Sequence, residues 1–242
     1  MNLCIDQGNS RTKVGLFSQN KLMEDFKYDQ FGKKELSDIL VEFPVKNCII
    51  SSVLSDNKEL IEDLNTKIQF SIELTHDTAL PIVNSYSTPE TLGNDRLAAV
   101  VGASFLKPES NILVIDAGTA ITYDLIDSTQ NYLGGNIAPG LLMRLQSLHE
   151  YTQKLPLVAP EIESPLIGIS TKSAILSGAL YGIVFEIDGY IDALKIKYPQ
   201  LSTFLTGGST FYFDTKLKNA IFAERNLVLI GLNRILQYNV QK

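Results

Sequence analysis

The sequence has little of several residue types on which common active sites depend. Its 242 residues include two cysteines, two histidines and no tryptophan. Both cysteines, Cys4 and Cys48, lie in apolar runs, whereas His76 and His149 lie far apart. We therefore expect the cysteines to be buried, reduced thiols. A zinc site or a Ser-His-Asp triad has almost nothing on which to be built.

Basic charge and long apolar runs are also scarce. The 21 Lys and Arg residues are outnumbered by 27 Asp and Glu residues, which gives a net charge of −6. Nonspecific nucleic-acid binding needs clustered Lys and Arg instead. The first residues lack the basic head and apolar run of a signal peptide, and no stretch approaches the roughly 20 apolar residues of a membrane span. These features predict a cytoplasmic protein with no nucleic-acid or membrane partner.

Strand and helix patterns alternate along the chain, which is typical of an α/β fold. The Gly-rich loop followed by Lys and Ser or Thr that marks a P-loop nucleotide site is missing, so a P-loop kinase is not expected. In the first part we expect strands at residues 2–6, 12–17, 47–53 and 70–75, and helices at residues 33–43, from Ser55 to about 67, and from about Asn94. In the second part we expect a strand at residues 203–206 and helices at residues 141–150, 171–195 and 227–236, the last preceded by one more helical pattern.

A polar, proline-containing segment at residues 107–110 is the best domain boundary, and the chain after it resembles a second beginning. A shift of 110 residues places Leu3, Ile5, Asp6, Gly8 and Thr12 on Leu113, Ile115, Asp116, Gly118 and Thr122. Both sets fall on a strand–turn–strand unit with the aspartate at the end of its first strand. We interpret this as an internal duplication, which predicts an N-terminal domain at residues 1–107 and a C-terminal domain at residues 108–242.

The first chemical motif is the segment Asp6-Gln7-Gly8-Asn9-Ser10-Arg11-Thr12-Lys13. A glycine in a tight hairpin lets backbone N–H groups approach an anion, and an aspartate at a strand end can hold hydrated Mg²⁺. A plain β-hairpin would also explain this segment alone. However, the second half supplies Asp116-Ala117-Gly118-Thr119. Two such hairpins facing each other across a cleft can grip the phosphates of a nucleotide, and this arrangement resembles the actin-like, sugar-kinase and Hsp70-like superfamily.

The second motif is Gly93-Asn94-Asp95-Arg96 at an expected helix start. The free N–H groups and positive dipole end of a helix favour anions there. Arg96 can bind a carboxylate in bidentate fashion, and Asp95 can accept a proton from a substrate hydroxyl. Helix capping by Asn94 or Asp95 is an equally good explanation from the local sequence.

A third candidate is Thr171, at the start of the longest expected helix. The simplest role for this residue is that of an N-cap, although an N-cap hydroxyl also points into any cleft that the helix end faces. Ser177, Gly178 and Gly182 within the same helix indicate close helix packing, which could serve a dimer interface.

The order of these motifs resembles one family in particular, the type III pantothenate kinases. The resemblance runs from residue 2 to about residue 236. It rests on the first hairpin, on Tyr86 seven residues before Gly93, on the second hairpin as far as Asp124, on residues 134–141 with their continuation to Leu155-Pro156, on residues 171–178, and on Thr206-Gly207-Gly208. The implied fold is α/β, with two duplicated RNase H-like (actin-like ATPase) domains and a nucleotide cleft between them.

The resemblance also implies an activity and a set of roles. The activity is ATP-dependent phosphorylation of pantothenate to 4'-phosphopantothenate, the first step of coenzyme A biosynthesis, in a homodimer that uses Mg²⁺ and potassium or ammonium. Asp95 would accept the proton of the substrate hydroxyl, and Asp116 would hold the monovalent cation. The residues implied to bind ATP are Asp6, Gln7, Gly8, Asn9, Ser10, Arg11, Thr12, Lys13 and Thr119. The residues implied to bind pantothenate are Tyr86, Gly93, Asn94, Asp95, Arg96 and Thr171.

Some positions depart from the pattern of the family. Ser10 and Ile121 stand where threonine is commoner, and Ser209 stands where an acidic residue is commoner, on the expected adenosine side. Two alternatives therefore remain at this point. One is a kinase for another small hydroxy acid or a sugar, and the other is a noncatalytic regulatory paralogue.

Overall fold

The computed structural model describes residues 1–8, 11–54 and 57–241. The expected ATP-binding residues Asn9 and Ser10, and the expected helix cap Ser55, lie outside the described residues. The chain divides into two compact units. Unit 1 comprises Met1–Pro108, Gln130–Tyr132 and the residues from Asn226 onward, and unit 2 comprises Glu109–Thr129 and Leu133–Arg225. The last helix therefore belongs to unit 1, whereas the division into residues 1–107 and 108–242 remains a prediction about the duplicated halves.

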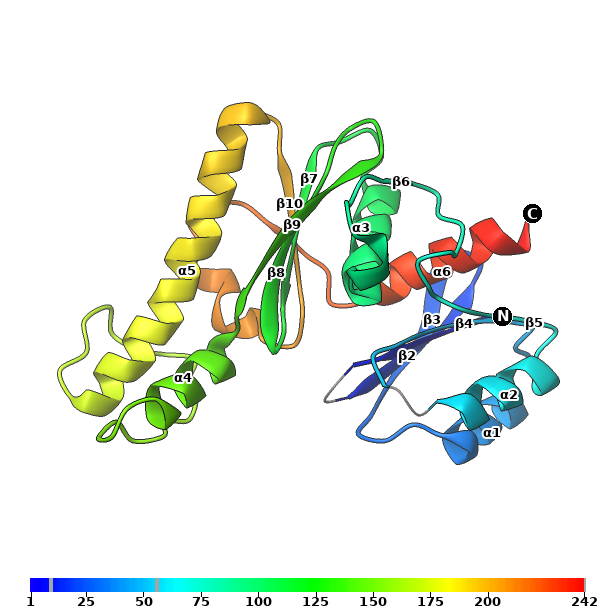
Figure 1. The fold of residues 1–242 in the computed structure, drawn as a ribbon, viewed down its shortest axis with the longest axis horizontal. Helices are drawn as coiled ribbons and strands as arrows, with labels where there is room; N and C mark the ends of the chain where they lie inside the picture. The colour runs from blue at the N-terminus through cyan, green and yellow to red at the C-terminus, as the bar shows by residue number, and fades with distance from the viewer. Residues whose placement is uncertain (9–10, 55–56, 242) are drawn as a thin grey trace. The chain divides into compact units, whose positions relative to one another are not determined.

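Unit 1 is a mixed sheet covered by helices on both faces (Figure 1). Its strand order is β3-β2-β1-β4-β5, with β1 antiparallel to β2 and parallel to β4. Leu3 and Ile5 of β1 face a core that includes Leu36 of α1 and Leu64 of α2, while α6 packs against β1, β2 and β4. The elements of this unit are β1 Asn2–Gln7, β2 Thr12–Ser18, β3 Lys21–Tyr28, α1 Lys33–Glu42, β4 Asn47–Ser52, α2 Lys58–Lys67, β5 Phe70–Glu73, β6 Val83–Asn84, η1 Pro89–Thr91, α3 Asn94–Leu106 and α6 Leu227–Val240.

Unit 2 repeats this sheet. Its strands follow the order β11-β10-β7-β8-β9, with β7 antiparallel to β8 and parallel to β10. The first residues of β9 belong to unit 1, where they pair with β6. Its elements are β7 Ile112–Ala117, β8 Ala120–Ile126, β9 Asn131–Pro139, α4 Leu141–Glu150, α5 Thr171–Lys197, β10 Ser202–Thr206, η2 Thr210–Tyr212, η3 Asp214–Lys216 and β11 Phe222–Ala223. Because β9-β8-β7-β10-β11 matches β3-β2-β1-β4-β5 strand for strand, the internal duplication is visible in the topology.

The strand registers refine the duplication. In unit 1 Asp6 pairs with Lys13 across the hairpin, whereas in unit 2 Asp116 pairs with Thr122. The turn of unit 2 is therefore one residue shorter. The shift of 110 residues holds along the first strand but becomes 109 after the turn. Thr122 therefore occupies the place of Lys13. The alignment of Thr122 with Thr12, which the sequence suggested, is wrong.

Helices α3 and α6 pack together through two glycines. A Cβ added at Gly102 would lie 2.3 Å from the backbone O of Leu227, and one added at Gly231 would lie 1.7 Å from the backbone O of Ala98. Only glycine permits so close an approach of the two backbones. This contact holds α3, which begins with the second motif, against α6.

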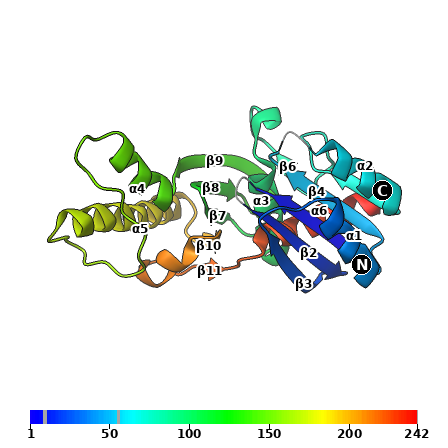
Figure 2. The same ribbon diagram turned by 90° about the horizontal axis from the view of Figure 1, so that it is seen from below.

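Helix α5 corrects one expectation from the sequence. Its 27 residues include a window with a mean hydropathy of 1.4, long and apolar enough to cross a membrane, so the expectation that no stretch approaches a membrane span is wrong. However, 56% of that window is buried, and Leu180, Ile183 and Ile187 lie in the core of unit 2. Helix α5 is thus the core helix of unit 2, with α4 packed beside it (Figure 2).

Most of the expected elements are confirmed. Cys4 and Cys48 are buried, free thiols, and burial raises the pKa of both. The helical pattern expected before α6 is wrong, because this segment forms only the short 3₁₀ turns η2 and η3. Strands β3, β6, β9 and β11 were not predicted, and in β3 the many charged residues hide the strand pattern.

Candidate active site

The first hairpin forms a closed turn at the end of β1. The backbone N–H of Gly8 donates to the backbone O of Arg11 at 3.1 Å. Asp6 and Lys13 are partners across the two strands, and both side chains are half-buried. Arg11 Nε lies 3.3 Å from Asp29 Oδ1 in an exposed ion pair. The turn thus presents a carboxylate and an ammonium group beside the backbone of a glycine.

The remaining described residues of this hairpin are buried. Gln7 is 2% exposed, and its Nε2 donates to the backbone O of Phe31 at 3.4 Å. Its partner across the strands, Thr12, is 4% exposed. Successive side chains of a strand point to opposite faces, so the faces that carry Asp6 and Gln7 differ. The side chain of Gln7 therefore lies on the buried face of the strand, in contact with the segment at Phe31.

The turn of the second hairpin is in contact with glycines from two other segments of the chain, Gly140 before α4 and Gly207 after β10. The backbone N–H of Gly118 donates to the O of Ala120 at 3.0 Å, and Gly140 N donates to the O of Thr119 at 3.0 Å. A Cβ at Gly140 would lie 2.4 Å from that same oxygen. Thr119 itself is exposed. The start of α4 therefore lies directly against the turn that carries Thr119.

Asp116 lies against a third glycine, Gly207, which follows β10. Gly207 has a φ of +106°, and an added Cβ would lie 2.5 Å from Asp116 Oδ1 and 2.5 Å from the O of Ala117. Only glycine suits both the backbone conformation and the space. The first turn has no glycine at the matching place, where Ser51 and Ser52 end β4. Gly207 thus reserves space around the Asp116 carboxylate.

The two aspartates share a second feature that the sequence did not reveal. Asp6 pairs with Ser51 of the parallel strand β4, and Asp116 pairs with Thr206 of the parallel strand β10. Each unit thus sets a carboxylate beside a buried hydroxyl residue at the ends of two parallel strands. Within the described residues, no group of three or more His, Cys, Asp or Glu lies together. Single carboxylates with backbone oxygens fit Mg²⁺, which keeps several waters and binds through one or two carboxylates and substrate phosphates.

The second motif gathers around the start of α3, whose N-cap is Gly93. Asp95 is exposed, and its Oδ1 accepts from the backbone N–H of Arg96 at 2.8 Å. A Cβ at Gly93 would lie 2.5 Å from that oxygen, so the glycine makes room for the carboxylate. Asn94 Nδ2 donates to the backbone O of Leu74 at 2.7 Å, which ties the helix start to the segment after β5.

Tyr86 and Arg96 are brought together by the fold. The Arg96 guanidinium carbon lies 5.6 Å from the centre of the Tyr86 ring, and Arg96 is 6% exposed. On another side Tyr86 stacks on Tyr132, with ring centres 6.0 Å apart and planes at 23°. Tyr132, which is fully buried, was missed because it lies 46 residues further along the chain, and nothing in the sequence links the two rings.

Thr171 is the first residue of α5 and is exposed, but it is not the N-cap. The cap is Ser170, whose side chain accepts from the N–H of Ser173. Thr171 belongs to unit 2, whereas Tyr86 and the residues from Gly93 to Arg96 belong to unit 1.

A charged network in unit 2 also escaped the sequence reasoning. Tyr123 Oη donates to Glu186 Oε1 at 2.7 Å, and Arg144 Nη2 donates to Glu186 Oε2 at 2.7 Å. Arg144 Nε donates to the O of Pro139 at 2.7 Å, one residue before the glycine that contacts the Thr119 turn. Burial and the contact with Glu186 raise the pKa of Tyr123 far above its ordinary range. The network anchors the start of α4.

The sequence model of the family described as type III pantothenate kinase matches residues 2–193. The chain belongs to the type III pantothenate kinase family. Its members phosphorylate pantothenate in coenzyme A biosynthesis, with ATP as the phosphoryl donor.

A relative of known sequence agrees with this assignment to the type III pantothenate kinases, and a solved structure agrees with the fold. The chain is 49% identical over 240 residues to a type III pantothenate kinase of Phocaeicola vulgatus, and the match covers 99% of both proteins. Among solved structures, it resembles a conserved Campylobacter jejuni protein assigned to the Baf family of transcriptional activators. That match has a TM-score of 0.66 and 24% identity, and it covers 99% of this chain and 100% of that one.

A more distant structure shows the breadth of the fold. The activator of the 2-hydroxyisocaproyl-CoA dehydratase from Clostridium difficile, solved with ADPNP bound, matches with a TM-score of 0.52 and 12% identity, covering 98% of this chain and 93% of that one. At identities of 24% and 12%, the two matches are evidence for the fold alone. They confirm the expected α/β fold of actin-like ATPases with its two sheets.

Proposed function

We propose that this chain transfers the γ-phosphoryl group of ATP to the primary hydroxyl of pantothenate, in the cytoplasm, with Asp95 as the proton acceptor. The observation that carries this proposal is the arrangement at the start of α3. There an exposed carboxylate, a cation and an aromatic ring stand together at a helix N-terminus. Membership of the family identifies pantothenate as the substrate. The residues at the start of α3 are the basis for the roles that we assign.

In the proposed reaction, the hydroxyl oxygen of pantothenate forms a bond to the γ-phosphorus, and the bond from that phosphorus to the ADP oxygen breaks. The hydroxyl proton passes to Asp95. Oδ1 of Asp95 already accepts from the N–H of Arg96, whereas Oδ2 has no hydrogen-bond partner among the described residues and is the oxygen assigned to the proton. Because phosphoryl transfer goes through a loose transition state, the base acts late, and positioning matters most.

The remaining residues bind and orient the substrates. We assign Tyr86, Gly93, Asn94, Arg96 and Thr171 to pantothenate, with the positive charge of Arg96 facing its carboxylate. We assign the two hairpins to ATP, through Lys13, Thr119 and the backbone of the glycine turns. Asn9 and Ser10 keep their assignment to ATP from the resemblance alone.

Metal ions complete the assignment. Asp6 would hold Mg²⁺, and Asp116 would hold potassium or ammonium, where Gly207 leaves space beside the carboxylate. When bound, these cations neutralise negative charge on the β- and γ-phosphates. The carboxylates of Asp6 and Asp116 would hold these cations, and the ammonium group of Lys13, opposite Asp6, is the positive charge that the protein itself adds.

The proposal includes a homodimer. Large apolar side chains are exposed along α4, the segment after it, and α5: Leu142, Tyr151, Ile167, Ile169 and Phe185 are between 60% and 96% exposed. Exposed apolar side chains that gather into one patch mark a protein–protein contact more often than a free surface. We propose a second copy of the chain as the partner that covers it.

A coupled assay of ADP release tests the proposed function. The protein receives Mg-ATP with pantothenate, with pantothenol, or with no acceptor, each in potassium and in sodium salt. We expect turnover that requires an acceptor, a higher KM for pantothenol because it lacks the carboxylate, and a collapse of the rate in sodium. Folded protein that releases no ADP with pantothenate in either salt would refute the proposal.

A further inference from the structure

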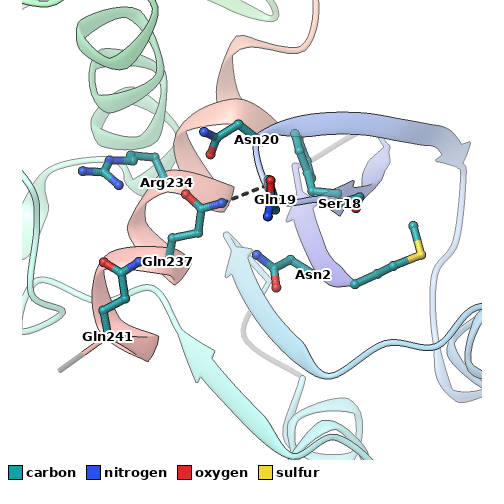
Figure 3. Close-up of a pocket in the computed structure, with 9 residues that line it drawn as sticks. Asn2, Ser18, Gln19, Asn20, Arg234, Gln237 and Gln241 are labelled. Atoms are coloured by element: carbon teal, nitrogen blue, oxygen red, sulfur yellow. Dashed lines mark hydrogen bonds between the residues drawn. The ribbon is translucent and has the colours of Figure 1, made fainter.

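Two cavities of unit 1 adjoin the side chain of Arg234 on α6. The larger has a volume of about 510 Å³ and is lined chiefly by polar side chains, among them Asn20, Gln237 and Gln241 (Figure 3). The smaller has a volume of about 290 Å³ and is lined by Pro81, Ile82, Val101, Ser104, Phe105, Pro108, Gln130 and Arg234. In Figure 3 the Arg234 guanidinium points away from Gln237. Arg234 lines both cavities, so its charged group borders the smaller cavity as well as the larger one.

Arg234 is a half-buried cation without a counter-ion among the described residues. Its guanidinium carbon lies 5.6 Å from the centre of the Phe105 ring, and no carboxylate of the described residues forms an ion pair with it. Cation–π contact offsets part of the cost of removing a guanidinium from water. The contact with Phe105 leaves the N–H groups of the planar guanidinium available to a ligand in the cavity. Their geometry matches that of a carboxylate.

Gln130 adds a second donor to the same cavity. The hydroxyl of Ser104, which is 3% exposed, donates to Oε1 of Gln130. Gln130 also accepts from the backbone N–H of Val83 through its own backbone O at 2.9 Å. Since the side-chain oxygen is occupied, the amide NH₂ is the group left to meet a ligand. It has no hydrogen-bond acceptor among the described residues.

The rest of the cavity wall is apolar. Ile82, Val101 and Phe105 contribute hydrocarbon surface, and none of the lining residues, all of which the structure describes, is Asp or Glu. Ligand pockets typically combine such apolar walls with a few placed polar groups. With two hydrogen-bond donors and no acidic side chain, the cavity favours an anionic ligand. Its apolar walls favour a ligand with a short apolar tail.

We propose that this cavity, formed by Ile82, Val101, Ser104, Phe105, Gln130 and Arg234, binds a small monocarboxylate with an apolar tail. Arg234 and Gln130 donate hydrogen bonds to the carboxylate, and Ile82, Val101 and Phe105 cover the tail. The cavity is distinct from the proposed substrate segment. Ser104 lies eight residues along α3 from Arg96, a rise of about 12 Å. The proposal does not depend on the proposed kinase activity.

Butyrate is the probe, and butyramide is its neutral counterpart of the same shape. Binding is measured by titrating each into isotope-labelled protein and following backbone amide shifts by NMR. For so small a ligand we expect a dissociation constant on the order of 1 mM for butyrate, and binding at least about tenfold weaker for butyramide, because it loses the charge-assisted hydrogen bonds.

Two variants and one control locate the site. Arg234→Gln removes the cation, and Gln130→Glu places a carboxylate beside the ligand's own while keeping an oxygen for Ser104. Both should weaken butyrate binding at least about tenfold. Gln241→Ala, which changes only the larger cavity, should leave it unchanged. Circular dichroism establishes that each variant is folded.

Several results would overturn the proposal. These are no shift changes with butyrate at concentrations well above its expected dissociation constant, equal affinity for butyramide, or unchanged affinity in Gln130→Glu. Equal losses in Gln241→Ala and Arg234→Gln would assign the ligand to the larger cavity instead. Inorganic phosphate that binds more tightly than butyrate would contradict the role of the apolar walls.

Discussion

The Arg96 guanidinium lies over the ring of Tyr86, 5.6 Å from its centre, and joins two segments that are ten residues apart in the sequence. Tyr86 lies after β6, and Arg96 lies in the first turn of α3. Because Tyr86 also stacks on the buried Tyr132, the cation and the ring hold each other in one geometry. The proposed pantothenate contacts therefore depend on the ring as much as on the charge.

Replacing Tyr86 tests this dependence. Tyr86→Leu removes the cation–π contact, which is worth about 0.5–2 kcal/mol, so we expect the KM for pantothenate to rise about two- to thirtyfold with little change in the KM for ATP. Tyr86→Phe keeps the ring and serves as the control. Steady-state kinetics with each substrate varied in turn make the comparison. If the leucine variant changes both KM values equally, Tyr86 has only a structural role.

Gly140 is expected to control the turn that carries Thr119, which we assign to ATP. An added Cβ would lie 2.4 Å and 2.5 Å from the backbone O atoms of Thr119 and Gly118, so Gly140→Ala must displace that turn. Small displacements of a positioning group can cost up to about a hundredfold in rate, and we expect kcat/KM for ATP to fall about ten- to hundredfold. Retention of the wild-type value would show that the turn does not contact ATP.

Gly207 combines a positive φ with contact to the Asp116 carboxylate. Gly207→Ala introduces backbone strain and overpacking together, which predicts a loss of about 2–4 kcal/mol in the free energy of unfolding. Gly208→Ala is the matched control, because an added Cβ there meets nothing within 4 Å. Urea denaturation of both variants measures the difference. Equal stability of the two would mean that Gly207 is not required for the conformation of this turn.

The link between α5 and the segment after η3 predicts a dependence on pH. Lys218 Nζ lies 2.6 Å from Asp192 Oδ2, and hydrogen bonds from Lys218 and Asn219 lower the pKa of Asp192 below its ordinary value of 3.8. A lowered carboxyl pKa in the folded state stabilises the fold above the unfolded pKa. That contribution is lost as the pH falls through the folded pKa.

Thermal unfolding of Asp192→Asn checks the sign of this effect. The Tm of the variant should lie below that of the wild type at neutral pH, and the gap should close as the pH falls below about 4. The ion pair is exposed, so the gap should also shrink with added salt. A gap that widens on acidification would contradict the assignment.

Local patterns in the sequence predicted the elements that carry the site. The glycine turns after β1 and β7, and the helix start at Gly93, follow from residues within a few positions of one another. The repeated aspartate at the strand ends indicated the duplication, and the two matching sheets confirm it. In these places local conformation and function depend on the same few residues.

Contacts between distant segments were out of reach. The stacking of Tyr86 on Tyr132, and the packing of Gly207 against Asp116, depend on strand pairing that no local pattern encodes. Strand β3 is an edge strand with mixed charge, so it shows neither clean alternation nor an apolar run. The sequence also did not reveal that the turn of the second hairpin is one residue shorter than that of the first. For this reason Thr122, and not Tyr123, lies opposite Asp116 across the strands.

The most direct test of the whole account is the rate of ADP release by Asp95→Asn with saturating pantothenate and Mg-ATP. The asparagine keeps the shape of the side chain but cannot take the proton, so we expect kcat to fall by about two orders of magnitude or more, with ATP binding intact. Asp77→Asn, at an exposed carboxylate elsewhere in unit 1, should keep the wild-type rate. A near-wild-type kcat for Asp95→Asn would remove Asp95 from the mechanism and contradict the central claim.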